Sequence, residues 1–132
     1  MKYALLIYGN EKNAQTLGEA DQQRIMMGHF AFTEALNKAD ANLGGEALEP
    51  THTATSVKHN GGKPLITDGP YADTKEQLGG FYLINAETLD EAIDWAKQLA
   101  AIADDTVEVR PVWDTSNMVP TDAASSGQQA GA

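Results

Sequence analysis

Residues 80–103 read GFYLINAETLDEAIDWAKQLAAIA and set a predicted strand directly before a predicted helix. The segment from Gly80 to Asn85 is aromatic and aliphatic, as is typical of a strand. Thr88 and Glu91 fit a capping box, in which a hydroxyl and a carboxylate each satisfy an unpaired amide at the start of a helix. The helix then carries an apolar stripe at helical spacing, formed by Leu89, Ala92, Ile93, Ala96, Leu99, Ala100 and Ala103.

The N-terminal part of the chain repeats this arrangement. Tyr3 to Tyr8 is a predicted strand, and its continuous apolar run indicates that both of its faces are covered. Thr16 and Glu19 fit a second capping box, which predicts a helix that ends near Asn42. The side of this helix that faces the sheet is expected to carry Ile25, Met26, His29, Phe32, Thr33, Leu36 and Ala39.

Four further strands complete the predicted order, at residues 43–48, 51–59, 63–67 and 106–113. Asn60-Gly61 predicts a tight turn that joins the second and third of these as a hairpin, because both central positions of such a turn need positive φ. The chain therefore reads β-α-β-hairpin-β-α-β, an α+β class of fold with the ferredoxin-like plan and an inserted hairpin.

Both helices of that plan bury their stripes on the same face of an antiparallel sheet. The opposite face carries Leu, Ile, Val, Phe and Tyr, which is too large an apolar patch for a monomer. We therefore expect a homodimer that packs sheet on sheet, with a pocket between sheet and helices or between the two sheets.

Composition limits the organisation and the partners. The chain has 132 residues, so one domain is expected, at residues 1–113, and the polar residues 114–132 are expected to form a flexible tail. A net charge of −10 repels phosphate backbones and anionic lipids, so neither nucleic acid nor membrane is an expected partner. The N-terminal apolar run is too short for a signal peptide or a membrane span, which predicts a cytoplasmic protein.

The same sequence offers no pattern for a cofactor. It contains no cysteine, which excludes disulfides, thiolate metal sites and a cysteine nucleophile. His52 and His59 are not joined to acidic residues in a metal-ligand pattern, and no glycine-rich nucleotide motif is present. We expect neither a metal nor an organic cofactor.

One stretch resembles a known family. The run DGPYADTKEQLGGFYLI at residues 68–84 closely resembles the signature of DGPF-domain proteins within the YCII-related family. It departs from that signature at Tyr71, where Phe is usual, and at Asp73, where Glu is usual. The resemblance implies a dimeric α+β barrel. It also implies a possible chemistry, since a distant YCII-related relative is a dehydrochlorinase of a chlorinated hydroxyquinol with a proposed His–Asp active site, a pair that here would be His29 and Asp68.

The candidate catalytic residues are Asp68 and His29. Asp68 ends a predicted strand, where a carboxylate in a dry pocket can act as a general acid or base, although an Asp at this position also commonly caps its own turn. His29 faces the sheet and can shuttle a proton near neutral pH, or it can be a core histidine with one hydrogen bond.

The candidate substrate-binding residues are Tyr71, Lys75, Glu76 and Tyr82. Lys75 can hold an anion and Glu76 can assist Asp68, or the two can form an ion pair that fixes the loop. The tyrosines can stack on an aromatic ligand, or they can lie in a dimer interface.

Two functions follow from these residues. The first is a small-molecule enzyme that performs cofactor-independent acid–base chemistry, such as a lyase or dehydrochlorinase reaction, on an enolisable or phenolic substrate. The alternative is a non-catalytic dimeric module that binds a small ligand or a protein. The sequence alone leaves open whether the chain is an enzyme.

Overall fold

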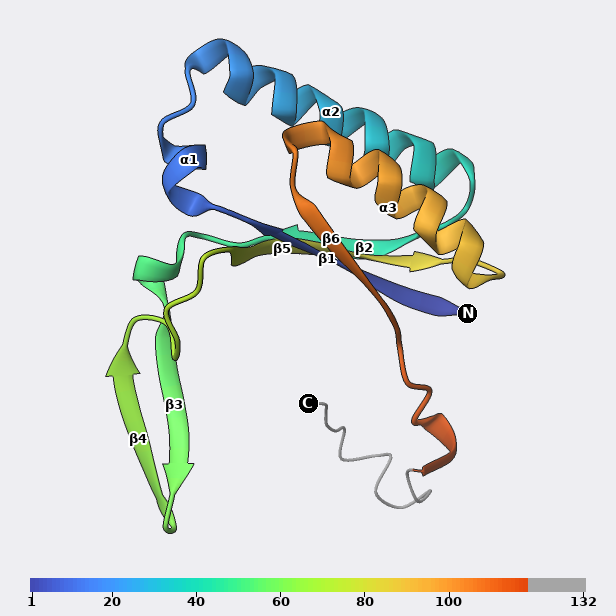
Figure 1. Ribbon diagram of the computed structural model, residues 1–132. Coiled ribbons are helices and arrows are strands. Elements are labelled where there is room, and N and C mark those ends of the chain that lie inside the picture. Colours follow the sequence, from blue (N-terminus) through green and yellow to red (C-terminus); the bar gives the residue numbers. More distant parts are fainter. Residues whose placement is uncertain (119–132) are drawn as a thin grey trace.

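A computed structural model describes residues 1–118 of the protein (Figure 1). Its strands are β1 (Lys2–Gly9), β2 (Asn42–Ala47), β3 (Thr55–Asn60), β4 (Lys63–Asp68), β5 (Gln77–Asn85) and β6 (Thr106–Pro111). Its helices are α1 (Glu11–Gln15), α2 (Glu19–Lys38) and α3 (Leu89–Ala103), with short 3-10 turns η1 (Thr51–Thr53) and η2 (Ser116–Met118).

Four strands form one antiparallel sheet in the order β2-β5-β1-β6, and β3 pairs with β4 as a separate hairpin. The two halves of the chain are therefore interleaved, because β1 and β5 occupy the centre and each is followed by a long helix. Both α2 and α3 lie on the same face of the sheet (Figure 1). The predicted α+β class, the four-stranded antiparallel sheet and the separate hairpin are confirmed.

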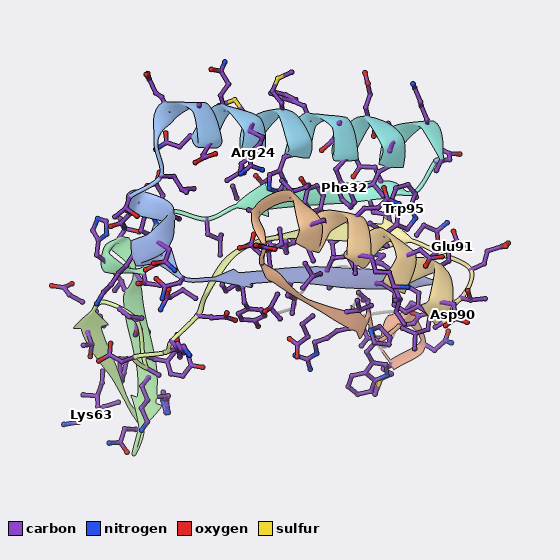
Figure 2. All side chains as sticks on the ribbon, turned by 45° about the horizontal axis from the view of Figure 1, so that its top comes forward. Arg24, Phe32, Lys63, Asp90, Glu91 and Trp95 are labelled. Carbon is purple, nitrogen blue, oxygen red and sulfur yellow. The ribbon has the colours of Figure 1, made fainter. Side chains whose placement is uncertain are left out.

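Strand alternation decides which side chains form the core. Tyr3 and Leu5 of β1 pair with Ile84 and Tyr82 of β5, and these side chains face the helices. The largest fully buried side chains are Leu5, Leu36, Ile84 and Leu99. Phe32 and Trp95 meet edge to face between the two helices, with ring centroids 5.8 Å apart (Figure 2).

The two predicted capping boxes have different outcomes. Thr88 Oγ1 accepts a hydrogen bond from the Glu91 amide at 3.2 Å, so the start of α3 is confirmed. The box at Thr16 and Glu19 is wrong. The Thr16 hydroxyl donates to the Asn13 carbonyl at the end of α1, a helix that the sequence analysis missed, and α2 begins after Gly18 without a side-chain cap.

Helix α2 ends at Lys38 and not near Asn42, because a Schellman turn closes it. The Asp40 amide donates to Asn37 and the Ala41 amide to Leu36, and Asp40 takes the left-handed φ of 58° that this turn requires. Met26, which was predicted to face the sheet, is 57% exposed.

Other predicted boundaries also shift. Residues 51–53 form a 3-10 turn in place of the start of a strand, β5 begins at Gln77, before the predicted Gly80, and β6 ends at Pro111, before the predicted Trp113. The hairpin turn occupies Gly61 and Gly62, with φ values of 59° and 86°, so the turn lies one residue later than Asn60-Gly61.

The hairpin of β3 and β4, here called the arm (residues 55–68), leaves the sheet on the side away from α2 and α3 (Figure 1). Its root is closed by a hydrogen bond of 2.7 Å from the Gly69 amide to the Ala54 carbonyl. Within residues 1–118, no helix is both long and apolar enough to cross a bilayer. The predicted tail lies mostly outside the described residues, of which the last form η2.

Candidate functional site

A cavity of about 480 Å³ lies between the helical layer and one end of the sheet. It therefore lies in the first of the two places predicted for a pocket, between sheet and helices. Its walls come from β1, α1, α2, β2, β5 and the turn before β6, and they consist of Ile7, Gly9, Asn10, Glu11, Ala14, His29, Thr33, Gly45, Glu46, Ala47, Gln77, Gly79, Gly80, Phe81, Tyr82 and Asp105.

His29 and Tyr82 meet inside this cavity. His29 Nδ1 lies 2.8 Å from the Tyr82 hydroxyl, and the two rings are nearly parallel, with centroids 6.0 Å apart. Phe32 packs edge to face on Tyr82 with centroids 5.0 Å apart, which fixes the tyrosine ring. His29 lies on the predicted side of its helix and points toward the sheet.

Burial lowers the pKa of His29 from its ordinary value of 6.5, because desolvation disfavours the charged imidazolium. The ring is therefore neutral near pH 7. A neutral imidazole has one donor and one acceptor nitrogen, so the contact of Nδ1 with Tyr82 determines whether Nε2 accepts or donates a proton. The pair can relay a proton between a ligand and the tyrosine hydroxyl.

Asp105 is a further titratable side chain in the cavity wall, and no sequence pattern predicted it. Burial raises its pKa, and the negative charges of Glu76 and Asp104 raise it further. A Cβ built on Gly9 would lie 2.5 Å from Asp105 Oδ1, so the absence of a side chain at Gly9 makes room for this carboxylate. Asp105 follows the left-handed residue that ends α3, and only the fold brings it beside β1.

The other predicted site residues lie elsewhere. Asp68 is the exposed last residue of the arm, Tyr71 is 93% exposed in the turn that follows, and neither is part of the cavity wall. Glu76 lies close enough to Asp105 to raise its pKa. The carbonyl of Lys75 accepts a hydrogen bond of 3.4 Å from Asn10 Nδ2. The single chain thus brings His29 and Tyr82 together but does not bring His29 and Asp68 into one cavity wall.

A family model of the YCII-related domain matches residues 1–116. The chain belongs to the YCII-related family. The family predicted from the run at residues 68–84 is confirmed. An uncharacterized protein of Rhizobium meliloti (strain 1021) is 39% identical over 115 residues, which cover 85% of this chain and 92% of that protein. The family model establishes the family, and this uncharacterized relative assigns no function to the chain.

Helix α1 connects the cavity of this YCII-related domain to the arm. The Thr51 amide and hydroxyl both donate to the Glu11 carboxylate, at 2.6 and 2.8 Å, just before the arm begins. The Glu11 amide donates to Gln77 Oε1 at 3.0 Å, at the start of β5. Asn10 caps this short helix by accepting from the Asn13 amide, and an Asn before an acidic residue is the signal that could have predicted it.

The cavity wall of the YCII-related domain is acidic. Glu11, Glu46 and Asp105 contribute to it, while no Lys or Arg among residues 1–118 does. The same described residues contain no group of three or more His, Asp or Glu side chains placed to hold a metal ion. The chemistry that the described wall itself offers is proton transfer by His29, Tyr82 and Asp105.

Proposed function

We propose that this YCII-related protein is a homodimeric enzyme that carries out acid–base chemistry, without a cofactor, on an enolisable or phenolic small molecule. The observation that carries the proposal is the hydrogen bond between His29 and Tyr82 in the wall of a cavity large enough for a small ligand. The proposal names the class of reaction and leaves the substrate to experiment.

In the proposed reaction, His29 is the general base. With Nδ1–H donated to the Tyr82 oxygen, Nε2 has a free lone pair and takes the proton from a C–H or O–H group of the substrate. The imidazolium that forms keeps its hydrogen bond to the Tyr82 oxygen. The protonated His29 then returns the proton to the product, and Asp105, whose pKa is raised by burial, lies in the same wall as a second group that can exchange protons. Such pairs of groups, one with a lowered and one with a raised pKa, are typical of acid–base sites.

The homodimer in this proposal is supported by the face of the sheet opposite to α2 and α3, which neither of these helices covers (Figure 1). Ala4 and Leu6 of β1 pair with Leu83 and Phe81 of β5, one position out of phase with the buried residues, so these four side chains point away from the helices. Glu108 and Arg110 of β6 flank them on the same face. An apolar strip with one charge of each sign at its edge suits a two-fold contact with a second copy, which we propose to form a dimeric α+β barrel.

Proton abstraction is tested most simply by hydrogen–deuterium exchange. Acetylacetone, as an enolisable probe, is incubated in D₂O with the protein, and exchange at its acidic carbon is followed by NMR. Release of chloride from chlorohydroxyquinol tests the dehydrochlorinase form of the proposal. We expect the protein to accelerate at least one of the two reactions, and His29→Ala to reduce that rate by about 10²–10⁴-fold.

Met27→Ala is the control, because Met27 is on the same helix and is 62% exposed. Tyr82→Phe should reduce the rate less than His29→Ala, since it removes the partner of the base and leaves the base in place. An unchanged rate in His29→Ala would contradict the proposed role. Binding of either probe without turnover would contradict the enzyme and favour the non-catalytic ligand-binding module.

A further inference from the structure

We infer that the arm docks on a second copy of this chain and acts as a clasp that holds the dimer. The inference rests on the proposed homodimer and goes beyond it, because it assigns a role to a segment that the sheet-on-sheet contact does not require. Three observations support it: the exposure of the arm, its direction and its charge.

The arm buries too little of its surface to be stable without a covering element. All six residues of β4 are exposed, and in β3 only Ser56 is not. Val57 and Ile66 lie opposite each other in the hairpin and are 66% and 71% exposed. An isolated two-stranded hairpin is at best marginally stable in water, and it usually needs a covering element to bury one face. The apolar pair is the surface that a partner would cover.

The direction of the arm points to what covers it. The arm extends on the side of the sheet opposite to α2 and α3, and its tip at Lys63 lies far from the helical layer in both views (Figures 1 and 2). The face of the sheet that α2 and α3 do not cover lies on that same side. A second copy seated on that face would therefore lie alongside the arm.

The root of the arm is held in this direction by several hydrogen bonds. The Ser56 hydroxyl donates to the Gly69 carbonyl at 2.8 Å, across the root. The bonds from Thr51 to Glu11 fix the preceding turn to α1. The arm is therefore presented to a second copy in a defined orientation, which lowers the entropic cost of docking.

Charge favours a second copy as the occupant. The arm contains two basic residues, Lys58 and Lys63, and one acidic residue, Asp68 at its root, in a chain whose net charge is −10. The arm thus carries +1 and the other residues carry −11. Outside the arm, two copies of the chain are both acidic and repel each other. Contact between the lysines of each arm and the acidic surface of the other copy offsets that repulsion. Two-fold symmetry lets each copy contribute one arm, so the assembly closes as a dimer.

The absence of cysteine allows a direct test by site-specific crosslinking. Asn60→Cys, at the tip of β3, is labelled with a benzophenone maleimide and irradiated, and Met27→Cys on the exposed side of α2 is the matched control. We expect the arm label to join two chains, with the crosslinked peptide in the body of the second copy, and the control label to yield no such product. A crosslink only within one chain, to residues 119–132 or elsewhere, would overturn the inference.

Charge reversal gives an independent measure. We expect Lys58→Glu combined with Lys63→Glu to raise the dimer dissociation constant by about tenfold at low salt, with a smaller effect at high salt. Lys38→Glu combined with Lys97→Glu makes the same change of net charge outside the arm and should have a much smaller effect. Equal effects of the two pairs would contradict a docked arm.

These results separate the arm from the proposed dimer. A wild-type protein that remains monomeric overturns both. A dimer that is broken by Leu6→Arg on the sheet face, but whose dissociation constant is unchanged by the arm variants and whose arm crosslinks stay within one chain, overturns the arm alone.

Discussion

The two long helices occupy equivalent places in the two halves of the fold, but they meet the sheet differently. Helix α3 buries Ala92, Ala96 and Leu99, which are spread over its length. Helix α2 is longer, yet its buried residues are Phe32 and Leu36, both in its C-terminal half. The middle of α2 lies over the cavity and contributes His29 and Thr33 to its wall. One helix thus stabilises the sheet, while the other also leaves room for a ligand.

The largest effect is expected when a buried side chain is removed from α3, which tests whether α3 contributes more to stability than the N-terminal part of α2. Leu99→Ala should lower the free energy of unfolding by about 2–5 kcal/mol, because Leu99 is 1% exposed and its loss leaves a cavity in the core. Met26→Ala in α2 should change it by no more than about 0.5 kcal/mol. Chemical denaturation measures both, and similar losses would show that the two helices are packed alike.

The second prediction concerns the space beside Asp105. Gly9→Ala should lower the free energy of unfolding by about 1 kcal/mol, because the new methyl group would displace the Asp105 carboxylate, which is the end of a side chain and can shift. Gly79→Ala is the matched control, since a Cβ there meets nothing within 4 Å. If the two variants are equally stable in denaturant titrations, the close contact of Gly9 with Asp105 is not a feature of the folded protein.

The third prediction compares the starts of the two helices. Thr88→Ala should cost about 1 kcal/mol of stability, because it removes the hydroxyl that caps α3. Thr16→Ala should cost less than about 0.5 kcal/mol, because that hydroxyl bonds the end of α1 and caps no helix start. Thermal denaturation of the two variants measures both losses of stability. Equal losses would contradict the finding that Thr88 caps a helix start and Thr16 does not.

The smallest expected effect is a pH dependence that originates in α2. Because the pKa of His29 is lowered by burial, the unfolded chain binds a proton more readily than the folded chain below pH 6.5. The neutral His29 ring therefore contributes its full stabilisation above pH 6.5. This contribution is lost as the pH falls toward the lower pKa that His29 has in the folded protein. His29→Gln should therefore flatten the pH dependence of the melting temperature in this window, whereas His52→Gln should leave it unchanged. The opposite slope would contradict burial as the cause.

The sequence predicted those parts of the fold that depend on local pattern. The cap at Thr88 and the burial of Ala92, Ala96 and Leu99 were predicted correctly, because a capped amphipathic helix leaves a regular pattern. The pattern at Thr16 was equally regular but wrong, since the intervening helix α1 used the threonine for its own end.

The site could be predicted only in part. His29 was identified because the helical spacing shows which side of α2 faces the sheet. Asp105 was not, because its approach to Gly9 depends on the pairing of β1 with β6, residues far apart in the chain. Asp68 was predicted from its position at the end of a strand and from the family resemblance, and neither indicates that the arm carries this residue away from the cavity wall.

The central claim is that the cavity beneath the middle of α2, with His29 in its wall, is the functional site of this YCII-related protein. An NMR titration of the wild-type protein with chlorohydroxyquinol tests it most directly, with the imidazole signals of the three histidines observed together. The account predicts that the His29 signals and the ring signals of Tyr82 move with the probe while those of His52 do not. Saturable binding that leaves His29 and Tyr82 unaffected, or no binding at all, would contradict it.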